Sequence, residues 1–395
     1  MAHWHVLLIS SAALALGWLW QAVAALRGMP TLPDLTRPGA VLPDLSSSEG
    51  PDVSVIVPAC NEEGSIEATL RSLLASTCVR LQIIAVDDRS TDRTGERMDA
   101  VAADYAGGPH TLEVIHNRDL PAGWMGKTHA LALAAGRATA EWMLLTDGDV
   151  VFDSRAIALS LGYADSERAD HVAVGLTLEL KGIAEAAVFA AFQAISAWNV
   201  HLWKVGDKKA WDFFGAGGFN FVRRDAYERV GGFESLRMEV VEDLRLAWKI
   251  KRAGFRQRFV TGPGLVRIHW IQSALGIVDL LEKNGFAGMR YRTGLALLAY
   301  LGLAVQILVP LAAIAMGGWA TVAGLFVYVS IFLMYAANRR ITMVSPWVAV
   351  FFAPATGILL FALMRSMILT ISRGGVVWRG TLYPLGELRR NAGRW

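Results

Sequence analysis

The segment MLLTDGDVVF, residues 143–152, runs from an apolar stretch into two carboxylates, Asp147 and Asp149, and back into apolar residues. A short apolar run is typical of a strand buried in a parallel sheet, and open α/β sheets bind ligands at the carboxyl ends of such strands. Two acids spaced i and i+2 around Gly148 can turn toward one hard cation, which can also hold the phosphates of a bound nucleotide. Because Asp-Gly is also a common turn dipeptide, the segment alone leaves a surface turn as an alternative.

The chain around this segment alternates between expected strands and expected helices. Strands are predicted at 53–59, 81–88, 112–117 and 141–147, and helices at 65–76, 91–105 and 127–137. Strands that alternate with helices of this length indicate βαβ units and a parallel sheet, so the sequence predicts an α/β fold. After Asp149 the pattern loosens, and the expected elements are a strand at 171–180, an apolar helix at 183–203, a glycine-rich loop at 214–225 and a helix near 242–253.

Apolar residues make up 54% of the 395-residue chain, and the mean hydropathy of +0.37 is too high for a purely soluble protein. Two regions carry the excess, residues 5–26 and most of the chain after Leu295, and both are long enough to cross a bilayer. The first has no preceding Lys or Arg and lacks a small-residue cleavage site, so we expect a retained anchor rather than a signal peptide.

The carboxyl-terminal apolar region raises a question of topology. Two expected spans, 295–316 and 319–337, return the chain at the basic run 338–340 to the side of the soluble domain, which satisfies the positive-inside rule if that domain is cytoplasmic. A third span over 347–371 would export a tail with five arginines. We therefore expect a re-entrant or interfacial hairpin bent at Pro354, with a Pro-kinked span as the alternative.

These features divide the sequence into six expected parts. They are an anchor at 1–27, a proline-rich linker at 28–52, the α/β domain at 53–265, an interfacial amphipathic segment at 266–294, a membrane region at 295–372 and a basic cytoplasmic tail at 373–395.

Charge and cysteine content exclude several classes of protein. The net charge is only +3 and the basic residues are dispersed, so we expect membrane phospholipid rather than nucleic acid as the polyanionic partner. Cys60 and Cys78 show no CxxC spacing, so neither a disulfide framework nor a zinc site is indicated.

Six motifs follow one another at a recognisable spacing. They are VIVPACNEE (55–63), VDDRSTDRT (86–94), LPAGWMGKTHAL (120–131), TDGDV (146–150), GGFNFVRRDAYERVGGF (217–233) and VEDLRLAWKIKRAGF (241–255). Together they resemble a membrane-anchored family 2 glycosyltransferase of the GT-A fold, a Rossmann-like α/β fold, over about residues 50–265. The flanking apolar segments agree with the lipid-acceptor branch, and LPAGWMGK and WRGTLYP are most similar to its hopanoid-associated group.

This resemblance implies a nucleotide-sugar donor, UDP-linked, bound along the first half of the sheet. Pro58, Asn61 and Glu62 would meet the base or ribose, with helix capping as the alternative role of this segment. Asp88 would contact uracil or ribose, with Asp87 as its neighbour.

The resemblance also assigns the diphosphate and the metal. Lys127 would contact the diphosphate at the start of a helix, although most lysines simply lie on the surface. Asp149 would bind Mg²⁺ or Mn²⁺ directly, and Asp147 would contact the metal or the ribose. A cation is needed because the nucleoside diphosphate leaving group builds negative charge as the glycosidic bond breaks.

A transfer to an alcohol also needs a base, which the resemblance places in VED. Asp243 would deprotonate the acceptor hydroxyl in a single displacement with inversion, with Glu242 as its rival and the loop GAGGFNF lining the acceptor pocket. The alternative is that both acids only stabilise a helix N-terminus.

One departure from the family bears on the product. The Gln-x-x-Arg-Trp motif of processive relatives is missing, which favours a single transfer to a lipid at the cytoplasmic face of a bacterial-type inner membrane, by a multi-pass protein. A processive polysaccharide synthase and a non-catalytic membrane scaffold are the alternatives, although a scaffold need not have kept Asp149 and Asp243.

Overall fold

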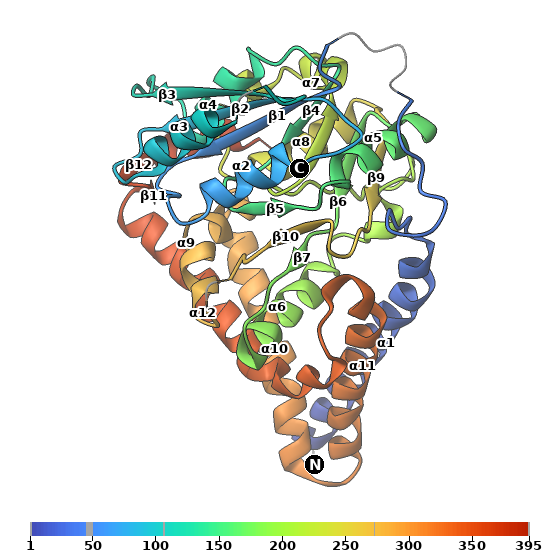
Figure 1. The fold of residues 1–395 in the computed structure, drawn as a ribbon. Helices are drawn as coiled ribbons and strands as arrows, with labels where there is room; N and C mark the ends of the chain where they lie inside the picture. The colour runs from blue at the N-terminus through green and yellow to red at the C-terminus, as the bar shows by residue number, and fades with distance from the viewer. Residues whose placement is uncertain (1, 45–49, 106, 272, 394–395) are drawn as a thin grey trace. The chain divides into compact units, whose positions relative to one another are not determined.

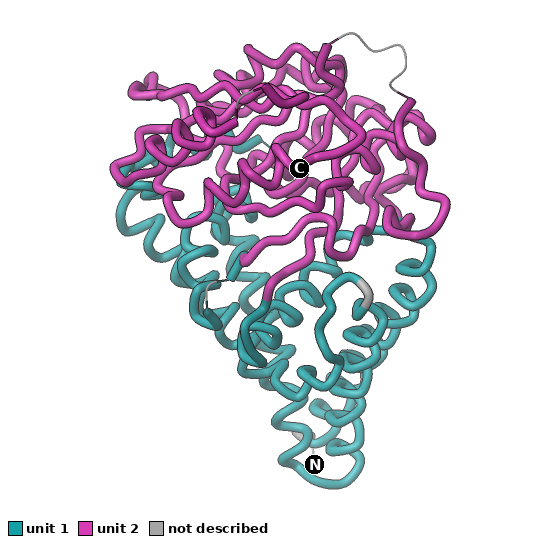
Figure 2. Tube along the Cα trace, in the orientation of Figure 1, with its two compact units in different colours: residues 1–31, 180–203, 270–394 teal, residues 32–179, 204–269, 395 magenta. Residues whose placement is uncertain are grey.

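The computed structural model describes residues 2–44, 50–105, 107–271 and 273–393. Residues 45–49 of the expected linker and 394–395 of the expected tail lie outside the described residues. The chain divides into two compact units (Figure 2): a helical unit of residues 1–31, 180–203 and 270–394, and a sheet unit that contains residues 32–179 and 204–269. This division differs from a continuous domain over 53–265, because residues 180–203 belong to the helical unit.

A mixed but mostly parallel sheet forms the centre of the sheet unit (Figure 1). Within the described ranges it has seven strands, in the order β3-β2-β1-β4-β8-β6-β9. The strands are β1 (Val53–Ala59), β2 (Leu81–Asp88), β3 (Thr111–Asn117), β4 (Trp142–Leu145), β6 (His171–Val174), β8 (Asn220–Arg223) and β9 (Gln257–Val260). Strands β3, β2, β1 and β4 are parallel, β8 is antiparallel to both β4 and β6, and β9 is parallel to β6. The predicted α/β fold is confirmed.

The strand order reverses between β1 and β4, and this position determines where a ligand can bind. The chain leaves β1 for β2 and β3 on one side and returns to β4 on the other, with Val53 paired to Leu81 and to Trp142. In open α/β sheets, ligands bind outside the carboxyl ends of the strands at such a switch point. Asp147 and Asp149 follow β4 at this place.

Helices and a second small sheet complete the sheet unit. Apolar side chains of α4, α7 and α8 pack on one face of the central sheet, and α2 and α3 pack against each other. The helices are α2 (Ile66–Leu74), α3 (Thr94–Asp104), α4 (Gly126–Ala135), α5 (Ala156–Ser166), α7 (Arg224–Arg229) and α8 (Glu242–Arg252), with the 3₁₀ helix η3 (Phe233–Leu236). The small sheet has the order β5-β10-β7, with β5 (Val150–Phe152), β7 (Thr177–Leu178) and β10 (Val266–Ile268).

The glycine-rich segment 214–225 is not a loop throughout, as the sequence predicted. Its second half forms β8, which enters the sheet because Phe219, Phe221 and Val222 are completely buried. Asn220 of β8 pairs with Leu145 of β4 and with Ala173 of β6. The prediction was wrong because glycines are typical of a loop, whereas the buried residues that follow them in the sequence form a strand.

The helical unit contains most of the apolar helices. They are α1 (Ala2–Gly28), α6 (Ile183–Ser196), α9 (Gly276–Gly288), α10 (Thr293–Met316), α11 (Gly318–Thr342), the 3₁₀ helix η4 (Pro346–Phe351), α12 (Phe352–Ser372) and α13 (Leu385–Ala392), with the hairpin β11 (Gly375–Trp378) and β12 (Thr381–Pro384). The 3₁₀ helices η1 (Met29–Thr31) and η2 (Leu202–Lys204) follow α1 and α6 along the chain. Trp18 of α1 is fully buried, edge-on to Trp198 and Phe352 at centroid distances of 5.3 and 5.4 Å.

Four stretches in the described part of the chain are long and apolar enough to cross a membrane. They are Trp4–Thr31, Thr293–Met316, Gly318–Arg339 and Pro346–Ser372. This agrees with the expected anchor and spans, and it identifies a fourth stretch where we predicted a hairpin.

Helix α12 corrects the prediction of a hairpin bent at Pro354. The helix is continuous from Phe352 to Ser372, and Pro354 is its third residue. A proline is tolerated there because the N–H groups of a first helical turn have no partner within the helix. We predicted a bend at this proline, but it lies in the first turn of the helix, where it removes no helical hydrogen bond.

An arginine inside α12 is compensated by an acid of α9. Glu282 forms ion pairs with Arg365 and with Arg373, the second at 2.7 Å. Charged groups in apolar surroundings are costly unless they are paired, so this triad explains how α12 accommodates Arg365. It also lowers the pKa of Glu282 against the opposing effect of burial.

Candidate active site

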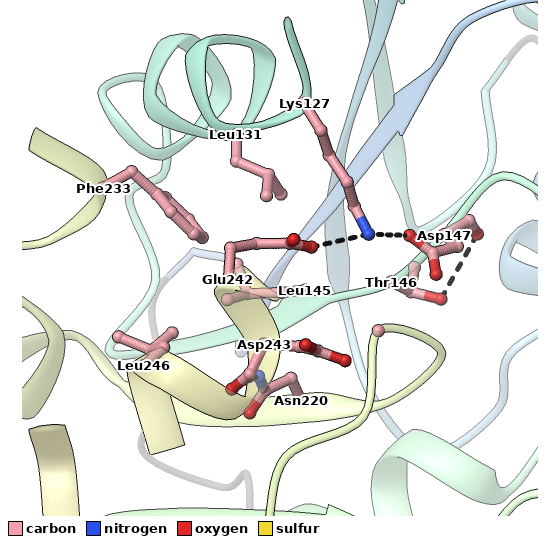
Figure 3. Close-up of a pocket in the computed structure, with 11 residues that line it drawn as sticks. Lys127, Leu131, Leu145, Thr146, Asp147, Asn220, Phe233, Glu242, Asp243 and Leu246 are labelled. Atoms are coloured by element: carbon pink, nitrogen blue, oxygen red, sulfur yellow. Dashed lines mark hydrogen bonds and ion pairs between the residues drawn. The ribbon is translucent and has the colours of Figure 1, made fainter. Parts of the chain in front are cut away.

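The candidate site is a pocket in the sheet unit at the carboxyl end of β4 (Figure 3). It is formed by the start of α4, the start of α8, the end of β4 and the loop before β8. Its lining residues are Lys127, Leu131, Leu145, Thr146, Asp147, Gly217, Asn220, Phe233, Glu242, Asp243 and Leu246. Four of the residues predicted from the sequence, at positions 127, 147, 242 and 243, are thus brought together from distant parts of the chain.

Lys127 bridges two carboxylates in this pocket. Its Nζ lies 2.6 Å from Asp147 Oδ1 and 2.6 Å from Glu242 Oε1. The lysine side chain is 22% exposed and that of Glu242 only 6%. Burial disfavours the ammonium ion, but the charges of Asp147, Glu242 and Asp243 outweigh it and raise the lysine pKa, so Lys127 stays protonated.

A glycine permits Lys127 to begin its helix at this point. A Cβ at Gly126 would lie 2.3 Å from Arg89 Nη2 and 2.6 Å from Asp88 Oδ2. Any other residue would have to displace the side chains of Arg89 and Asp88 at the end of β2. The motif GWMGK therefore places the lysine in the pocket through the absence of a side chain at the preceding position.

The two acids after β4 form a candidate metal centre. Asp149 Oδ1 is buried and has no hydrogen-bond partner among the described residues. Burial and the charges of Asp147 and Glu62 raise the pKa of Asp149 to about 7, against the effect of Lys127. An anion in this position is stabilised by a cation, and carboxylate oxygens suit Mg²⁺ and Mn²⁺.

The metal would have to be completed by other ligands. The described residues contain no cluster of three or more His, Cys, Asp or Glu side chains that could hold an ion. Mg²⁺ usually takes one or two carboxylates and obtains its other oxygens from water and substrate phosphates. The pair Asp147 and Asp149 fits a metal of that kind.

The two acids at the start of α8 have different surroundings. Glu242 is buried and ion-paired to Lys127, so its carboxylate is already engaged. Asp243 accepts a hydrogen bond from the Leu244 N–H at 2.7 Å. Burial and the charge of Glu242 raise the pKa of Asp243 to about 7, although Lys127 opposes the shift. Of the two, Asp243 is better suited to accept a proton near neutral pH.

The glycine-rich loop before β8 packs closely on the backbone of Asp243 and on the side chain of Asp147. A Cβ at Gly215 would lie 2.4 Å from the Asp243 carbonyl oxygen. A Cβ at Gly217 would lie 2.5 Å from Asp147 Oδ2 and 3.4 Å from Lys127 Nζ. Position 215 therefore requires glycine for space, because the clash is with backbone, whereas a side chain at 217 would displace the Asp147 carboxylate.

The other predicted nucleotide-binding residues lie outside the pocket lining. Asn61, in a left-handed conformation with φ of 57°, accepts a hydrogen bond from the Thr91 N–H at 2.8 Å. The Glu62 N–H donates to Thr94 Oγ1 at 2.7 Å. These bonds join the loop after β1, the strand that contains Pro58, to the loop after β2 and to the start of α3.

Asp87 and Asp88 are buried at the end of β2 and have partners of their own. Asp88 pairs with Arg89 at 3.0 Å and accepts a hydrogen bond from Asn117 Nδ2 at 2.8 Å. Asp87 lies 3.1 Å from His116 Nδ1, and this contact raises the pKa of the histidine. The structure therefore shows both aspartates at the expected sheet edge, with their carboxylates engaged by neighbouring side chains.

Several pocket residues were not singled out in the sequence. Thr146 Oγ1 donates to the Gly218 carbonyl at 2.9 Å and ties β4 to the glycine-rich loop. Asn220 and Phe233 contribute to the lining from β8 and η3. Both lie within motif GGFNFVRRDAYERVGGF, but only the antiparallel pairing of β8 with β4 brings Asn220 to the pocket.

Comparison with known proteins shows what this part of the chain is similar to. Residues 54–231 match the sequence model of Glycosyl transferase family 2. The probable glycosyltransferase YdaM of Bacillus subtilis is 28% identical over 218 residues, which are 53% of this chain and 49% of the relative. The 4,4'-diaponeurosporenoate glycosyltransferase of Staphylococcus haemolyticus is 32% identical over 98 residues, 25% of this chain and 24% of the relative. The chain thus spans about half or less of the length of these curated relatives.

A solved structure shares the fold over most of the chain. The mannosyltransferase PcManGT from Pyrobaculum calidifontis, solved with GDP-Man and Mn²⁺, superposes with a TM-score of 0.54 at 19% identity. The match covers 93% of this chain and 98% of that protein.

The Lys127 bridge predicts energetic coupling between α4 and α8. Lys127→Met should lower the free energy of unfolding, because it leaves the buried Glu242 carboxylate without its counter-charge. Adding Glu242→Gln should recover part of the loss, with a coupling of roughly 0.5–3 kcal/mol in a double-mutant cycle. Chemical denaturation of the purified protein measures each free energy.

The matched control is Lys208→Met, which removes an exposed lysine from the sheet unit. It should change stability little. Strictly additive losses for Lys127→Met and Glu242→Gln would contradict a direct bridge.

Proposed function

We propose that this chain, which carries a glycosyltransferase family 2 domain with a GT-A fold, is an inverting hexosyltransferase that moves a sugar from a nucleotide-sugar donor to a membrane lipid. The observation that carries the proposal is the pocket in which Lys127 joins an acid after β4 to an acid at the start of α8. The lysine ammonium group, an acid proposed to bind the metal and the acids at the start of α8 thereby lie within one site.

The donor half of the site consists of Lys127, Asp147 and Asp149. Asp149, with its unpartnered buried oxygen, and Asp147 would hold Mg²⁺ or Mn²⁺, which stabilises the charge of the diphosphate leaving group when bound. Lys127 would contact the diphosphate in exchange for part of its contact with the two acids. The presence of GDP-Man and Mn²⁺ in PcManGT supports this type of donor, and we propose a UDP-linked sugar for this chain.

Residues at the ends of β1 and β2 would hold the nucleoside. Pro58 lies near the end of β1, Asn61 and Glu62 follow this strand, and Asp87 and Asp88 end β2. Strand β1 lies between β2 and β4, the strand that leads to the acid pair. In this role Asp88 would exchange its contact with Arg89 for one with the base or ribose.

Asp243 would act as the base that deprotonates the acceptor hydroxyl. Its pKa of about 7 suits proton transfer near neutral pH, whereas the carboxylate of Glu242 is engaged in an ion pair with Lys127. Attack of the activated hydroxyl on the anomeric carbon displaces the nucleoside diphosphate in one step, so the configuration inverts.

The proposed acceptor is a lipid, reached at the cytoplasmic face of the membrane. Four membrane-length apolar stretches in the same chain support it, as does the name of the carotenoid-related relative from Staphylococcus haemolyticus. Similarity of two motifs to hopanoid-associated enzymes favours an acceptor of that class. The substrates are tested by incubating the purified protein with labelled UDP- and GDP-sugars and a bacterial lipid extract, where failure to label any lipid would contradict the proposal.

Metal dependence gives one prediction. Asp149→Asn should retain the fold but reduce transfer at least roughly 10–100-fold, since an amide cannot replace the anionic oxygen that a divalent ion needs. Chelator should abolish wild-type transfer, and added Mg²⁺ or Mn²⁺ should restore it. Asp104→Asn, which removes a carboxylate with 62% side-chain exposure, is the control for loss of one charge. Undiminished turnover in chelator would contradict the metal centre.

The base gives a second prediction. Asp243→Asn should reduce kcat by roughly 10²–10⁴-fold while donor affinity survives, because the donor half of the site is intact. For the wild type at saturating donor and metal, kcat should rise with pH through about 7, as the raised pKa of Asp243 requires. A carboxyl group with an ordinary pKa near 4 would give no such rise.

Glu242→Gln separates the two acids. It should weaken donor binding through the loss of its contact with Lys127 and keep the rise of kcat with pH. The assignment is wrong if Glu242→Gln, rather than Asp243→Asn, shows the selective loss of kcat.

Topology gives a third prediction. Because α9 and α12 pack together and Glu282 binds both Arg365 and Arg373, we propose that the carboxyl end of α12 lies on the same side of the membrane as α9. The apolar window of α12 is 44% buried inside the protein, against 22% for α10. A tag after Trp395 should therefore be accessible from the same side as a tag in the 28–52 linker. Opposite accessibility to a membrane-impermeant protease would show that α12 crosses.

A further inference from the structure

Three buried polar side chains lie side by side in the sheet behind the start of α8. Asn220, His171 and Gln257 belong to the neighbouring strands β8, β6 and β9, and they are 1%, 0% and 2% exposed. His171 and Gln257 are direct partners in the parallel pair β6 and β9. The catalytic assignments above use none of the three, although burying such groups is costly unless they are hydrogen-bonded.

Hydrogen bonds link these side chains into one chain with a fixed direction. The Phe214 N–H donates to Gln257 Oε1 at 3.1 Å, which orients the amide. Gln257 Nε2 then donates to the Ala247 carbonyl at 3.1 Å and to His171 Nδ1 at 2.9 Å. His171 Nε2 donates to Asn220 Oδ1, and Asn220 Nδ2 donates to the Asp243 carbonyl at 3.4 Å.

Both ends of this hydrogen-bond chain are backbone groups, so the orientation of each side chain within it is determined. A backbone N–H can only donate and a carbonyl can only accept, which leaves one orientation for each amide and the Nε2–H tautomer for the imidazole. A proton on Nδ1 would face the donor amide of Gln257. Burial lowers the pKa of His171 to about 4, so the ring is neutral at the pH where an enzyme of this type works.

The chain ends on the first turn of α8, the turn that carries Asp243. It binds the carbonyls of Asp243 and Ala247, which are four residues apart on one side of the helix. Its other end begins at Phe214, next to Gly215, which packs on Asp243 with no room for a Cβ. Asn220 also lines the pocket beside Asp243 (Figure 3).

We propose that the Gln257–His171–Asn220 chain positions the base: it fixes the first turn of α8 and the glycine-rich loop as one unit, so that the Asp243 carboxylate points into the pocket. These three are positioning residues, since they act on the reaction through Asp243. The inference rests on the proposed function for its kinetic consequence and on the hydrogen bonds for its structural consequence. Misplacement of a reacting group by about 1 Å can cost roughly 10²-fold in rate.

Asn220→Asp breaks only the last link. The new carboxylate keeps an acceptor for His171 Nε2 but presents an oxygen to the Asp243 carbonyl in place of the N–H donor. We expect kcat to fall roughly 10–100-fold with the donor KM unchanged. Hydrogen exchange of the amides in a peptide covering 242–247 should become faster.

His171→Leu and His171→Gln test the middle of the chain. His171→Leu removes both links and should lower kcat and protection of this peptide, whereas His171→Gln keeps a donor toward Asn220 and should recover part of both. Because partial recovery needs the hydrogen bond rather than the bulk of the side chain, it distinguishes positioning from packing.

The matched control is His110, a second buried imidazole in the same unit. It is 5% exposed, accepts a hydrogen bond from the Leu81 N–H at 3.1 Å and contacts the Ser76 carbonyl through Nε2 at 3.0 Å. Burial lowers its pKa as it does that of His171. His110→Leu should lower the unfolding temperature while kcat and the exchange of peptide 242–247 stay unchanged.

Two results would overturn the inference. One is an unchanged kcat and unchanged exchange of peptide 242–247 in Asn220→Asp, and the other is an equal loss of kcat in His110→Leu and His171→Leu. Hydrogen exchange does not depend on turnover. If the wild type transfers no sugar, the proposed function is wrong. Hydrogen exchange in the variants would still show whether the Gln257–His171–Asn220 hydrogen bonds hold the start of α8 in place.

Discussion

The contact of Lys127 with Asp147 and Glu242 is the constraint on which the site depends. The three residues come from the start of α4, the end of β4 and the start of α8, and no two of them are close in sequence. Two carboxylates at this distance would repel each other in the absence of a cation, with an energy that grows as water is excluded. The lysine therefore determines whether the first and second halves of the sheet unit can close around one pocket.

This contact is possible because the sheet and the glycines remove what would block it. The reversal of strand order between β1 and β4 opens the edge of the sheet at this place. Gly126 lets α4 begin against the end of β2, and Gly217 lets the loop before β8 approach Asp147 and Lys127. The charged groups thus meet through backbone positions where any side chain would collide.

The sequence predicted the parts of this arrangement that depend on local pattern. Strands β1 and β2 follow from continuous apolar runs, and Lys127, Asp147, Glu242 and Asp243 follow from motifs that end or begin such elements. Strand β8 was missed because its burial comes from pairing with β4 and β6, which a glycine-rich segment does not reveal. The continuous helix α12 was missed because Pro354 was expected to bend the segment, whereas it lies in the first turn of the helix. The engagement of Asp88 with Arg89 and Asn117 also depends on side-chain geometry that motifs do not contain.

The balance of charge in the site divides its four acids into two pairs. Asp147, Glu242 and Asp243 line the pocket with Lys127, and Asp149 also interacts with the charge of this lysine, so the site would hold an excess of negative charge if all four acids were ionised. The structure relieves this excess unequally: Lys127 contacts Asp147 and Glu242 directly, while the pKa values of Asp149 and Asp243 rise to about 7. Asp149 and Asp243, which the lysine does not contact directly, gain most from another positively charged partner. Under the proposed function, that partner would be a divalent cation for Asp149 and a proton taken from the acceptor for Asp243. One lysine would then separate a metal ligand from a base by directly contacting neither of them.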